Sequence, residues 1–445
     1  MRELSAYIAT ALRHPLPPEI VERARIHLVD TFAAMLSGSR LTPGKRAVAY
    51  VKSLGGKPEA GVVGTRVVTS VPNAVLANAM LAHADETDDT HPPSRTHPGS
   101  GVVPAALAIG ERDQVSGTEL LRAIVLGYDI CARIMLAINE VHFRKTGHHP
   151  STFGRGFGAV AAAAALLRFD ERQVRHALSY TAQQAAGLST VYRDLEHVEK
   201  AFMSGMPAEN GVVAALLVSQ GFTGVDDVFA GERNFFYTFA PEGDRSQLTR
   251  GLGREFEILR CGIKRWSAGG PIQGPLHVLR DLIRQHGFKG ADVEKLVARM
   301  PERDLQSVNN RDMPDICVQH LLAVMLADGT VTFKSAHDYT RMKDPKVIAM
   351  RKRVEAVGDP QLNDPQRRWR CVMEVTLKDG RVLNHQTLAA KGTSEDPLTR
   401  EEEEEKALDL IAPVLGKART KALLAALWNV DGLKSVRPLR KLASG

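Results

Sequence analysis

The sequence predicts a mainly α protein, with a large all-helical domain and a smaller α+β lid domain inserted before the C-terminal helices. Helical periodicity dominates from the start to about residue 260, and an alternation of period two then surrounds Asp379-Gly380. Helical texture returns after Lys391. A chain of 445 residues is long enough for two or three domains. We expect a helical domain over 1–263, onto which 395–445 pack back, and a lid domain over 264–394.

The first domain contains several stretches with helical spacing. Residues 17–38 begin with proline and stop at glycine, as helices do, and residues 117–140 form a nearly all-apolar helix that should be central. Abundant alanine and glycine should let the helices approach closely. The only strand expected there is a short piece such as "AGVVGT". Three further helices are predicted over 156–170, 171–188 and 207–222.

The second domain and the C-terminal segment have a different pattern of polar and apolar residues. "DVEKLVARM" (292–300) is predicted as a helix, and residues 368–388 as a β-hairpin that turns at Asp379-Gly380. The last segment, 393–416, begins with polar caps, a proline and a run of glutamates at 401–405. Acidic residues favour the first turn of a helix, so we interpret this run as a solvated helix start rather than a metal site.

Composition and charge narrow the function classes. The net charge is +7, but the Lys/Arg clusters are short and lack interleaved aromatic residues, which disfavours nucleic acid as a partner. A positive cleft could instead gather small di- and tricarboxylates. The four cysteines are scattered without CxxC spacing, which favours a reduced compartment. No secretory signal is recognised and the longest strongly apolar run, 157–167, is too short for a bilayer, so we expect a cytoplasmic protein without membrane contact.

The segment "HADETDDTHPPSRTHPGS" (83–100) carries the most chemistry. It holds three histidines and four acids, and its three prolines prevent it from continuing as a helix. A loop fixed between helices is a good platform for catalysis, and clustered carboxylates and histidines shift one another's pKa values. Asp88 and Asp89 are interpreted mainly as structural, bonding to the backbone. A terpene-synthase-like magnesium site at "DETDD" is disfavoured, because no second metal motif follows.

Four blocks carry a resemblance to a known family. "HADETDDT", "THPGSGVVPAALAIGE", "GHHPSTFGRGFGAVAAAAALL" and "KAFMSGMPAENGVVAALL" followed by "GFTG" together resemble the MmgE/PrpD family over nearly the whole chain. Members of this family include 2-methylcitrate dehydratase, cis-aconitate decarboxylase and iminodisuccinate epimerase. The resemblance implies a homodimeric enzyme that acts on a small polycarboxylate.

The resemblance also implies which residues form the site. Family positions that face the substrate fall on Thr90 and His97, and the family aspartate falls on Glu86, one methylene longer. A histidine that follows the family lysine is replaced here by Met203, and His320 stands where a tyrosine is expected. The implied catalytic residues are His97, His149, Lys200 and Lys264, and the implied substrate-binding residues are Glu86, Thr90 and His320.

These residue types suit a reaction without a metal or an organic cofactor. Histidine, with its pKa near neutrality, can take or give a carbon-bound proton, and lysines can stabilise enediolate-like charge on a carboxylate. Dehydration is our first expectation and decarboxylation the second. An epimerase that works through a carbanion is the alternative, and a non-catalytic carboxylate-binding protein is a weaker one.

Overall fold

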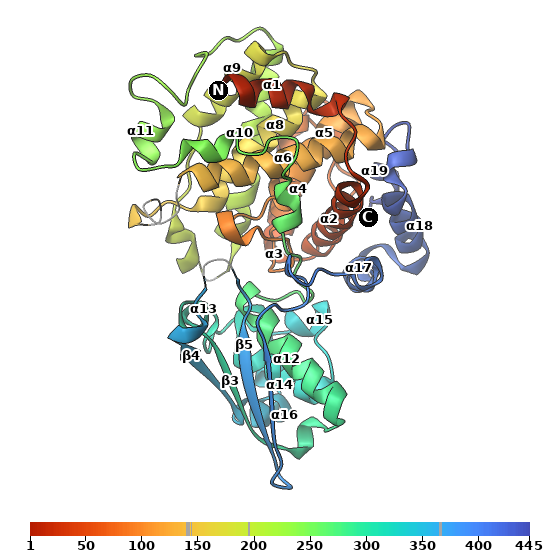
Figure 1. The fold of residues 1–445 in the computed structure, drawn as a ribbon. Helices are drawn as coiled ribbons and strands as arrows, with labels where there is room; N and C mark the ends of the chain where they lie inside the picture. Colours follow the sequence, from red (N-terminus) through yellow and green to blue (C-terminus); the bar gives the residue numbers. More distant parts are fainter. Residues whose placement is uncertain (139–142, 144, 195, 365–366) are drawn as a thin grey trace. The chain divides into compact units, whose positions relative to one another are not determined.

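The structure is a computed structural model that describes residues 1–138, 143, 145–194, 196–364 and 367–445. It divides into two compact units (Figure 1). The helical unit comprises residues 1–84, 88–261 and 403–445, and the lid unit comprises residues 85–87 and 262–402. Helices account for 60% of the chain and strands for 9%, which confirms the predicted mainly α class with a small α+β part.

The helical unit contains most of the helices. Its one hairpin of two short strands, β1 (Ala60–Gly61) and β2 (Val68–Thr69), confirms the short strand expected there. The predicted helices are present, although residues 139–140 of the helix predicted over 117–140 lie outside the described residues and the last helix begins well before Pro207, which lies inside it. The helices are α1 (Arg2–Thr10), α2 (Pro18–Gly38), α3 (Thr42–Leu54), α4 (Val71–Ala82), α5 (Gly99–Asp113), α6 (Gly117–Ile138), α8 (Pro150–Leu166), α9 (Glu171–Gln183), α10 (Val198–Ser219), α11 (Phe235–Phe239), α17 (Arg400–Leu415, from residue 403 on), α18 (Lys417–Trp428) and α19 (Leu439–Leu442).

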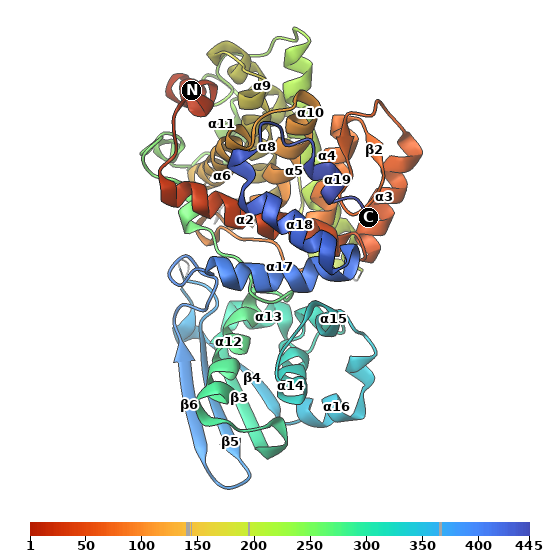
Figure 2. The ribbon, with the colours of Figure 1, turned by 90° about the vertical axis from the view of Figure 1, so that its right-hand side faces the viewer.

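Small residues bring the central helices together. Every residue of α8 is buried, and this helix packs against α6, α5 and α10. A Cβ atom on Gly158 of α8 would lie 2.6 Å from the carbonyl oxygen of Gly127 of α6, so this contact requires glycine. At the C-terminal end of the chain, α18 lies against α2 (Figure 2).

Among the described helices, α10 alone is long and apolar enough to cross a membrane by length and composition. Of its most apolar window, 61% is buried inside the protein. A core helix of a soluble protein has the same properties, and α10 packs against α4 and α8.

The lid unit is built on a four-stranded sheet of order β4-β3-β5-β6. Strand β3 is parallel to β4 and antiparallel to β5, and the β5–β6 hairpin turns at Asp379-Gly380, which confirms that prediction. The strands are β3 (Val293–Pro301), β4 (Val354–Asp359), β5 (Cys371–Leu377) and β6 (Val382–Thr387), and the helices are α12 (Gly270–His286), α13 (Glu302–Val308), α14 (Val318–Asp328), α15 (Phe333–Ala336) and α16 (Pro345–Arg351).

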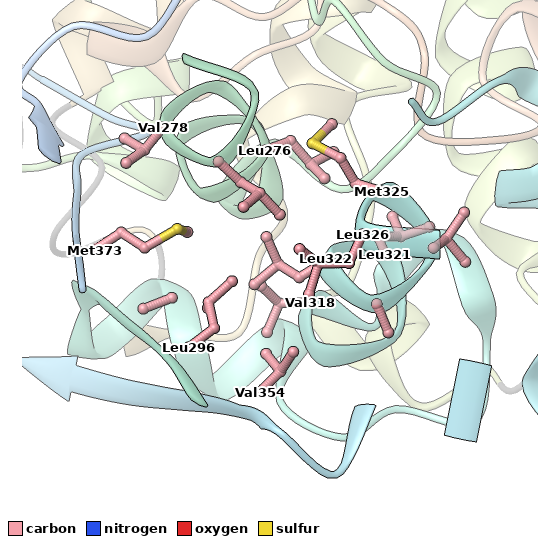
Figure 3. Close-up of a cluster of buried hydrophobic side chains, with 14 of the residues drawn as sticks. Leu276, Val278, Leu296, Val318, Leu321, Leu322, Met325, Leu326, Val354 and Met373 are labelled. Atoms are coloured by element: carbon pink, nitrogen blue, oxygen red, sulfur yellow. The ribbon is translucent and has the colours of Figure 1, made fainter. Parts of the chain in front are cut away.

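The predicted helix over 292–300 is wrong, because this segment is the strand β3. Its buried side chains Leu296, Ala298 and Met300 alternate along the strand, and they join the core formed by α12, α14 and the sheet. Leu276, Leu296 and Leu322 meet in this core (Figure 3).

The glutamate run 401–405 is only partly the solvated helix start that we expected. Glu403 is fully buried, and neither of its carboxylate oxygens has a hydrogen-bond partner among the described residues. Nearby in the helical unit, Lys406 bonds to the buried Asp30. Burial raises the pKa of Glu403 well above its ordinary value and that of Asp30 to about 7, with Lys406 opposing both shifts.

Candidate active site

His97 is held in the helical unit at both of its main-chain groups. Its N–H donates to Ser151 Oγ at 3.0 Å, and its carbonyl oxygen accepts from Arg155 Nε at 3.0 Å. Ser151 and Arg155 both lie in α8, and Pro98 and Gly99 lead from His97 directly into α5. The loop position of His97 is therefore fixed by two central helices, as the proline-rich segment predicts.

The side chain of His97 lies beside a buried histidine–carboxylate pair. Asp88 Oδ2 lies 2.7 Å from His83 Nδ1 and 3.4 Å from His97 Nδ1, and the two imidazole rings are 5.2 Å apart. The side chains of His83 and Asp88 are 2% exposed, whereas that of His97 is 23% exposed. Of these three groups, His97 is the one that a solute can reach.

Arg155 connects the groups around His97. This fully buried guanidinium also donates to the Met203 carbonyl oxygen at 3.4 Å, and its Nη2 lies 3.3 Å from His83 Nε2 and 3.8 Å from Asp88 Oδ2. Burial lowers the pKa of His83 well below its ordinary value, and Lys200 and Arg155 lower it further while Asp88 opposes them. His83 is therefore neutral near pH 7, and Arg155 and Lys200 are the cations that act on this group.

His149 and Lys200 belong to the same part of the helical unit. His149 is buried at the N-cap of α8, where its Nδ1 accepts from the Ser151 N–H at 3.2 Å. Because Ser151 Oγ accepts from the His97 N–H, one residue links the two predicted histidines. Lys200 lies in the first turn of α10, one turn before Met203, and acts electrostatically on His83.

Asp89 and Thr90 stabilise the segment from within. Asp89 Oδ1 accepts from the Gly99 N–H at 3.0 Å, which confirms the backbone role expected of this carboxylate. Thr90 is buried, and its hydroxyl donates to the Thr96 carbonyl oxygen over 3.5 Å. Residues 91 and 96 form an isolated antiparallel bridge that closes the loop.

The lid unit holds Lys264 and Glu86. Lys264 is 1% exposed, and its Nζ lies 3.3 Å from Glu86 Oε2. The residues on either side of Glu86 are also anchored within the lid unit: Thr87 Oγ1 lies 3.2 Å from Ser267 Oγ, and Asp85 Oδ2 lies 3.6 Å from His337 Nε2.

His320 lies in the core of the lid unit, on α14. It is fully buried, and neither ring nitrogen has a hydrogen-bond partner among the described residues. Burial, with smaller contributions from Arg351 and Arg341, lowers its pKa to about 4, so the ring is neutral near pH 7. His320 belongs to the lid unit, whereas His97 belongs to the helical unit.

Among the described residues of the helical unit, two groups offer metal-ligand atoms within 4.8 Å of one another, namely His27–Asp89–Cys261 and His83–Asp88–His97. In the first group, burial raises the pKa of the Cys261 thiol well above its ordinary value, so the sulfur is not the thiolate that metals prefer. In the second group, Arg155 and Lys200 oppose a dication and favour a carboxylate anion. The expectation of a metal-free site stays a prediction.

Sequence analysis did not single out His83 or Arg155. One signal could have found Arg155, because it interrupts "STFGRGFGAV", an apolar and glycine-rich window. A charge inside a buried helix needs partners, and such partners mark a polar site. His83 offers no such signal, since its role depends on the turn that brings Asp88 back to it.

Comparison with known proteins covers almost the whole chain. Family models of the MmgE/PrpD N-terminal domain and the MmgE/PrpD C-terminal domain match residues 2–247 and 266–430. The cis-aconitate decarboxylase of Homo sapiens is 25% identical, over 97% of this chain and 91% of its own length. The cis-aconitate decarboxylase of Mus musculus is also 25% identical, over 96% and 89%. The cis-aconitate decarboxylase-like protein oryM of Aspergillus oryzae is 23% identical, over 100% and 97%.

Proposed function

Because the chain belongs to the MmgE/PrpD family, an enzyme family of lyases, we propose that it removes carbon dioxide or water from a small di- or tricarboxylate, without a metal or organic cofactor. Sequence reasoning alone puts dehydration first. The relatives, which are named as cis-aconitate decarboxylases at about 25% identity, favour decarboxylation. We therefore put decarboxylation of an unsaturated acid such as cis-aconitate first, and dehydration of an acid such as 2-methylcitrate second.

One observation carries the proposal: His97, partly exposed, lies beside the buried Asp88 and accepts at its main chain from the cation Arg155, and Lys200 acts on the same group. An imidazole in such surroundings can exchange a proton with carbon while neighbouring cations stabilise the carboxylate that accepts the negative charge. Lys200 and Arg155 supply this positive charge in the helical unit. Lys200 would contact the substrate, and the buried Arg155 would act through His97 and Asp88.

The two reactions use the same groups in different orders. In decarboxylation, the bond to the departing carboxylate breaks, its electron pair moves through the adjacent double bond, and protonated His97 delivers its proton to the far carbon as carbon dioxide leaves. In dehydration, neutral His97 takes the proton from the carbon beside a carboxylate, a double bond forms, and the departing hydroxide takes this proton back from His97 and leaves as water, with the Nε2–H of His149 donating a hydrogen bond to the leaving oxygen. Both schemes conserve atoms and charge.

The remaining predicted residues keep their proposed roles. Lys264 would neutralise a substrate carboxylate, Glu86 would hold Lys264, and Thr90 and His320 would contribute to substrate binding. A homodimer and a cytoplasmic location are also proposals, and light scattering tests the first, with a mass of about twice 48.5 kDa expected.

A substrate panel tests the proposal. The purified protein is dialysed against EDTA and incubated in deuterium oxide with cis-aconitate, 2-methylcitrate, citrate, tartrate and iminodisuccinate. Carbon dioxide release, enoate absorbance and the mass of the recovered acid are followed. We expect carbon dioxide release or a new double bond with at least one acid, at a rate unchanged by EDTA.

Other outcomes point elsewhere. Deuterium entering an acid without any change in its formula favours the epimerase. Activity lost in EDTA and restored by magnesium contradicts the metal-free mechanism. Binding of an acid without turnover favours a carboxylate-binding protein and overturns the proposal.

A further inference from the structure

The ring of His97 is fixed through one of its two nitrogens. Its Nδ1 lies 2.6 Å from the main-chain carbonyl oxygen of Asp89. A carbonyl oxygen can only accept a hydrogen bond, so Nδ1 carries the hydrogen. In the neutral ring, Nε2 then keeps the lone pair and is the basic atom.

The residue that provides this carbonyl is itself held by three helices. Asp89 Oδ1 accepts from the Gly99 N–H at the start of α5, and Oδ2 accepts from Tyr128 Oη of α6 at 2.6 Å. His27 Nδ1 of α2 lies 2.9 Å from the same Oδ2. His27, Tyr128 and Asp89 are all at most 1% exposed.

The charge on Asp89 is favoured despite its burial. Burial by itself raises the pKa of this carboxyl, but hydrogen bonds from His27 and Tyr128 outweigh it, and the pKa ends below its ordinary value. Asp89 is therefore ionised near pH 7 and accepts hydrogen bonds from the Gly99 N–H and Tyr128 Oη.

The space beside these hydrogen bonds admits no side chain at residue 99. A Cβ atom at residue 99 would lie 2.6 Å from Tyr128 Oη and 3.0 Å from Asp89 Oδ1, so only glycine fits there. The two hydrogen bonds, the close His27 ring and the glycine leave the peptide of Asp89 little freedom to move.

We propose that Asp89, His27 and Tyr128 are positioning residues that hold His97 in the tautomer with hydrogen on Nδ1, so that Nε2 exchanges the proton with the substrate. This inference rests on the proposed function for its catalytic consequence. The tautomer itself is a property of the protein without substrate.

Asp88 is the competing explanation for the orientation of His97. Its Oδ2 is 3.4 Å from His97 Nδ1 but only 2.7 Å from His83 Nδ1. The Asp89 carbonyl is the shorter partner of His97, and Asp88 is the partner of His83. The variants that test the proposal therefore change the surroundings of Asp89 and leave Asp88 in place.

The experiment measures the tautomer and the kinetics together. In protein with ¹⁵N-labelled histidine, the ring signals of His97 are assigned by their loss in His97→Gln, and we expect hydrogen on Nδ1. Tyr128→Phe removes a hydrogen bond to Asp89, and His27→Leu removes the imidazole that lies 2.9 Å from the same carboxylate. We expect both to increase the other tautomer and to lower kcat about tenfold with KM within about twofold, a part of the usual acid–base contribution.

Two further variants separate positioning from stability. His27→Asn keeps an N–H near the place of Nδ1, so it should restore the tautomer and most of kcat. Tyr7→Phe removes a comparable bond, from Tyr7 Oη to Asp129 Oδ2 at 2.9 Å in the same unit, and should change neither the tautomer nor kcat.

The proposal is overturned if His97 of the unmodified protein carries its hydrogen on Nε2, a result that does not depend on any variant folding. It is also overturned if Tyr128→Phe and His27→Leu leave the tautomer and kcat unchanged. If the tautomer is as stated but no acid is turned over, the proposed function fails while the positioning of the ring stands.

Discussion

Arg155 stabilises the surroundings of His97 through geometry as well as charge. Its guanidinium donates to two main-chain carbonyl oxygens, those of His97 and Met203, and approaches Asp88 with a third nitrogen–oxygen distance of 3.8 Å. A planar group with five donors can do this, whereas an ammonium group on a flexible stem cannot reproduce the same directions. The position of the His97 main chain therefore depends on arginine rather than on positive charge alone.

Arg155→Lys should lower both stability and catalysis. We expect the free energy of unfolding to fall by about 2 to 4 kcal/mol, because buried acceptors lose their donors. We expect kcat to fall at least about tenfold, because His97 moves relative to its partners. Thermal unfolding and steady-state kinetics measure the two effects.

Arg133→Lys is the matched control. Arg133 is also buried, and it also donates to main-chain carbonyl oxygens, those of Arg250 and Glu255. Its replacement should cost similar stability with kcat unchanged. An equal fall of kcat in both variants would show that the Arg155 effect is general loss of stability.

Individual residues of the candidate site could be predicted where a short stretch of sequence already shows their chemical surroundings. His97 is identified by a proline-rich loop with neighbouring acids, and the structure places it among them. Arg155 was missed because a single arginine in a helical pattern is usually interpreted as a surface residue with an apolar stem. Its burial arises from α5 and α10, which are distant in sequence.

At the scale of elements, α8 shows how composition sets helix packing. The helix is rich in alanine and glycine and is buried along its whole length against α5, α6 and α10. Gly158 faces the backbone of Gly127 at a distance that leaves no room for a methyl group. Gly156, two residues earlier in α8, has no atom closer than 3.4 Å to an added Cβ.

These two glycines give a paired prediction. Gly158→Ala should lower the free energy of unfolding by about 1 to 3 kcal/mol, because the backbone of α6 must move. Gly156→Ala should be neutral or stabilise by up to about 1 kcal/mol, because alanine is the better helix former. Thermal unfolding of both variants measures this, and equal destabilisation would contradict the packing described here.

The secondary structure was predictable where a single hydrophobic periodicity, helical or alternating, dominates the segment. The hairpin at Asp379-Gly380 and the alanine-rich helices follow from their patterns. Residues 292–300 were misassigned because Val293, Leu296 and Met300 have helical spacings of three and four, and only pairing with β4 and β5 makes the segment a strand. The burial of Glu403 was missed because it depends on packing beside Asp30 of α2, which is distant in sequence.

At the scale of the whole molecule, the chain passes between its two units at four places, after residues 84, 87, 261 and 402. The first two crossings lie inside the segment 83–100, which holds the clustered histidines and carboxylates. Asp85, Glu86 and Thr87 belong to the lid unit, while His83, Asp88 and His97 belong to the helical unit. The predicted site residues are thus divided between both units, and the helical unit holds His97, the proposed proton-transfer group.

Buried carboxyls make the stability of the helical unit depend on pH. Glu111 accepts from the Gly61 N–H at 2.9 Å, and its burial raises its pKa from 4.5 to about 7, with Arg440 opposing the shift. The folded protein therefore binds a proton here that the unfolded chain has lost. Its stabilising contribution is full below about pH 4.5 and is lost as the pH rises through about 7.

Glu111→Gln removes this dependence, because the amide mimics the protonated carboxyl. Relative to the unmodified protein, the variant should gain stability between pH 5 and pH 8, by on the order of 2 to 3 kcal/mol. Unfolding temperatures of both proteins across this range measure the gain. A difference that stays constant with pH would contradict the raised pKa.

The central claim is that His97 exchanges a proton with the carbon of a polycarboxylate, and His97→Gln tests it most directly on the acid that the unmodified protein turns over. We predict a fall in kcat of at least about 100-fold, with KM within about threefold and the unfolding temperature nearly unchanged, since general acid–base catalysis contributes at least this much. Near-normal turnover by this variant would contradict the account.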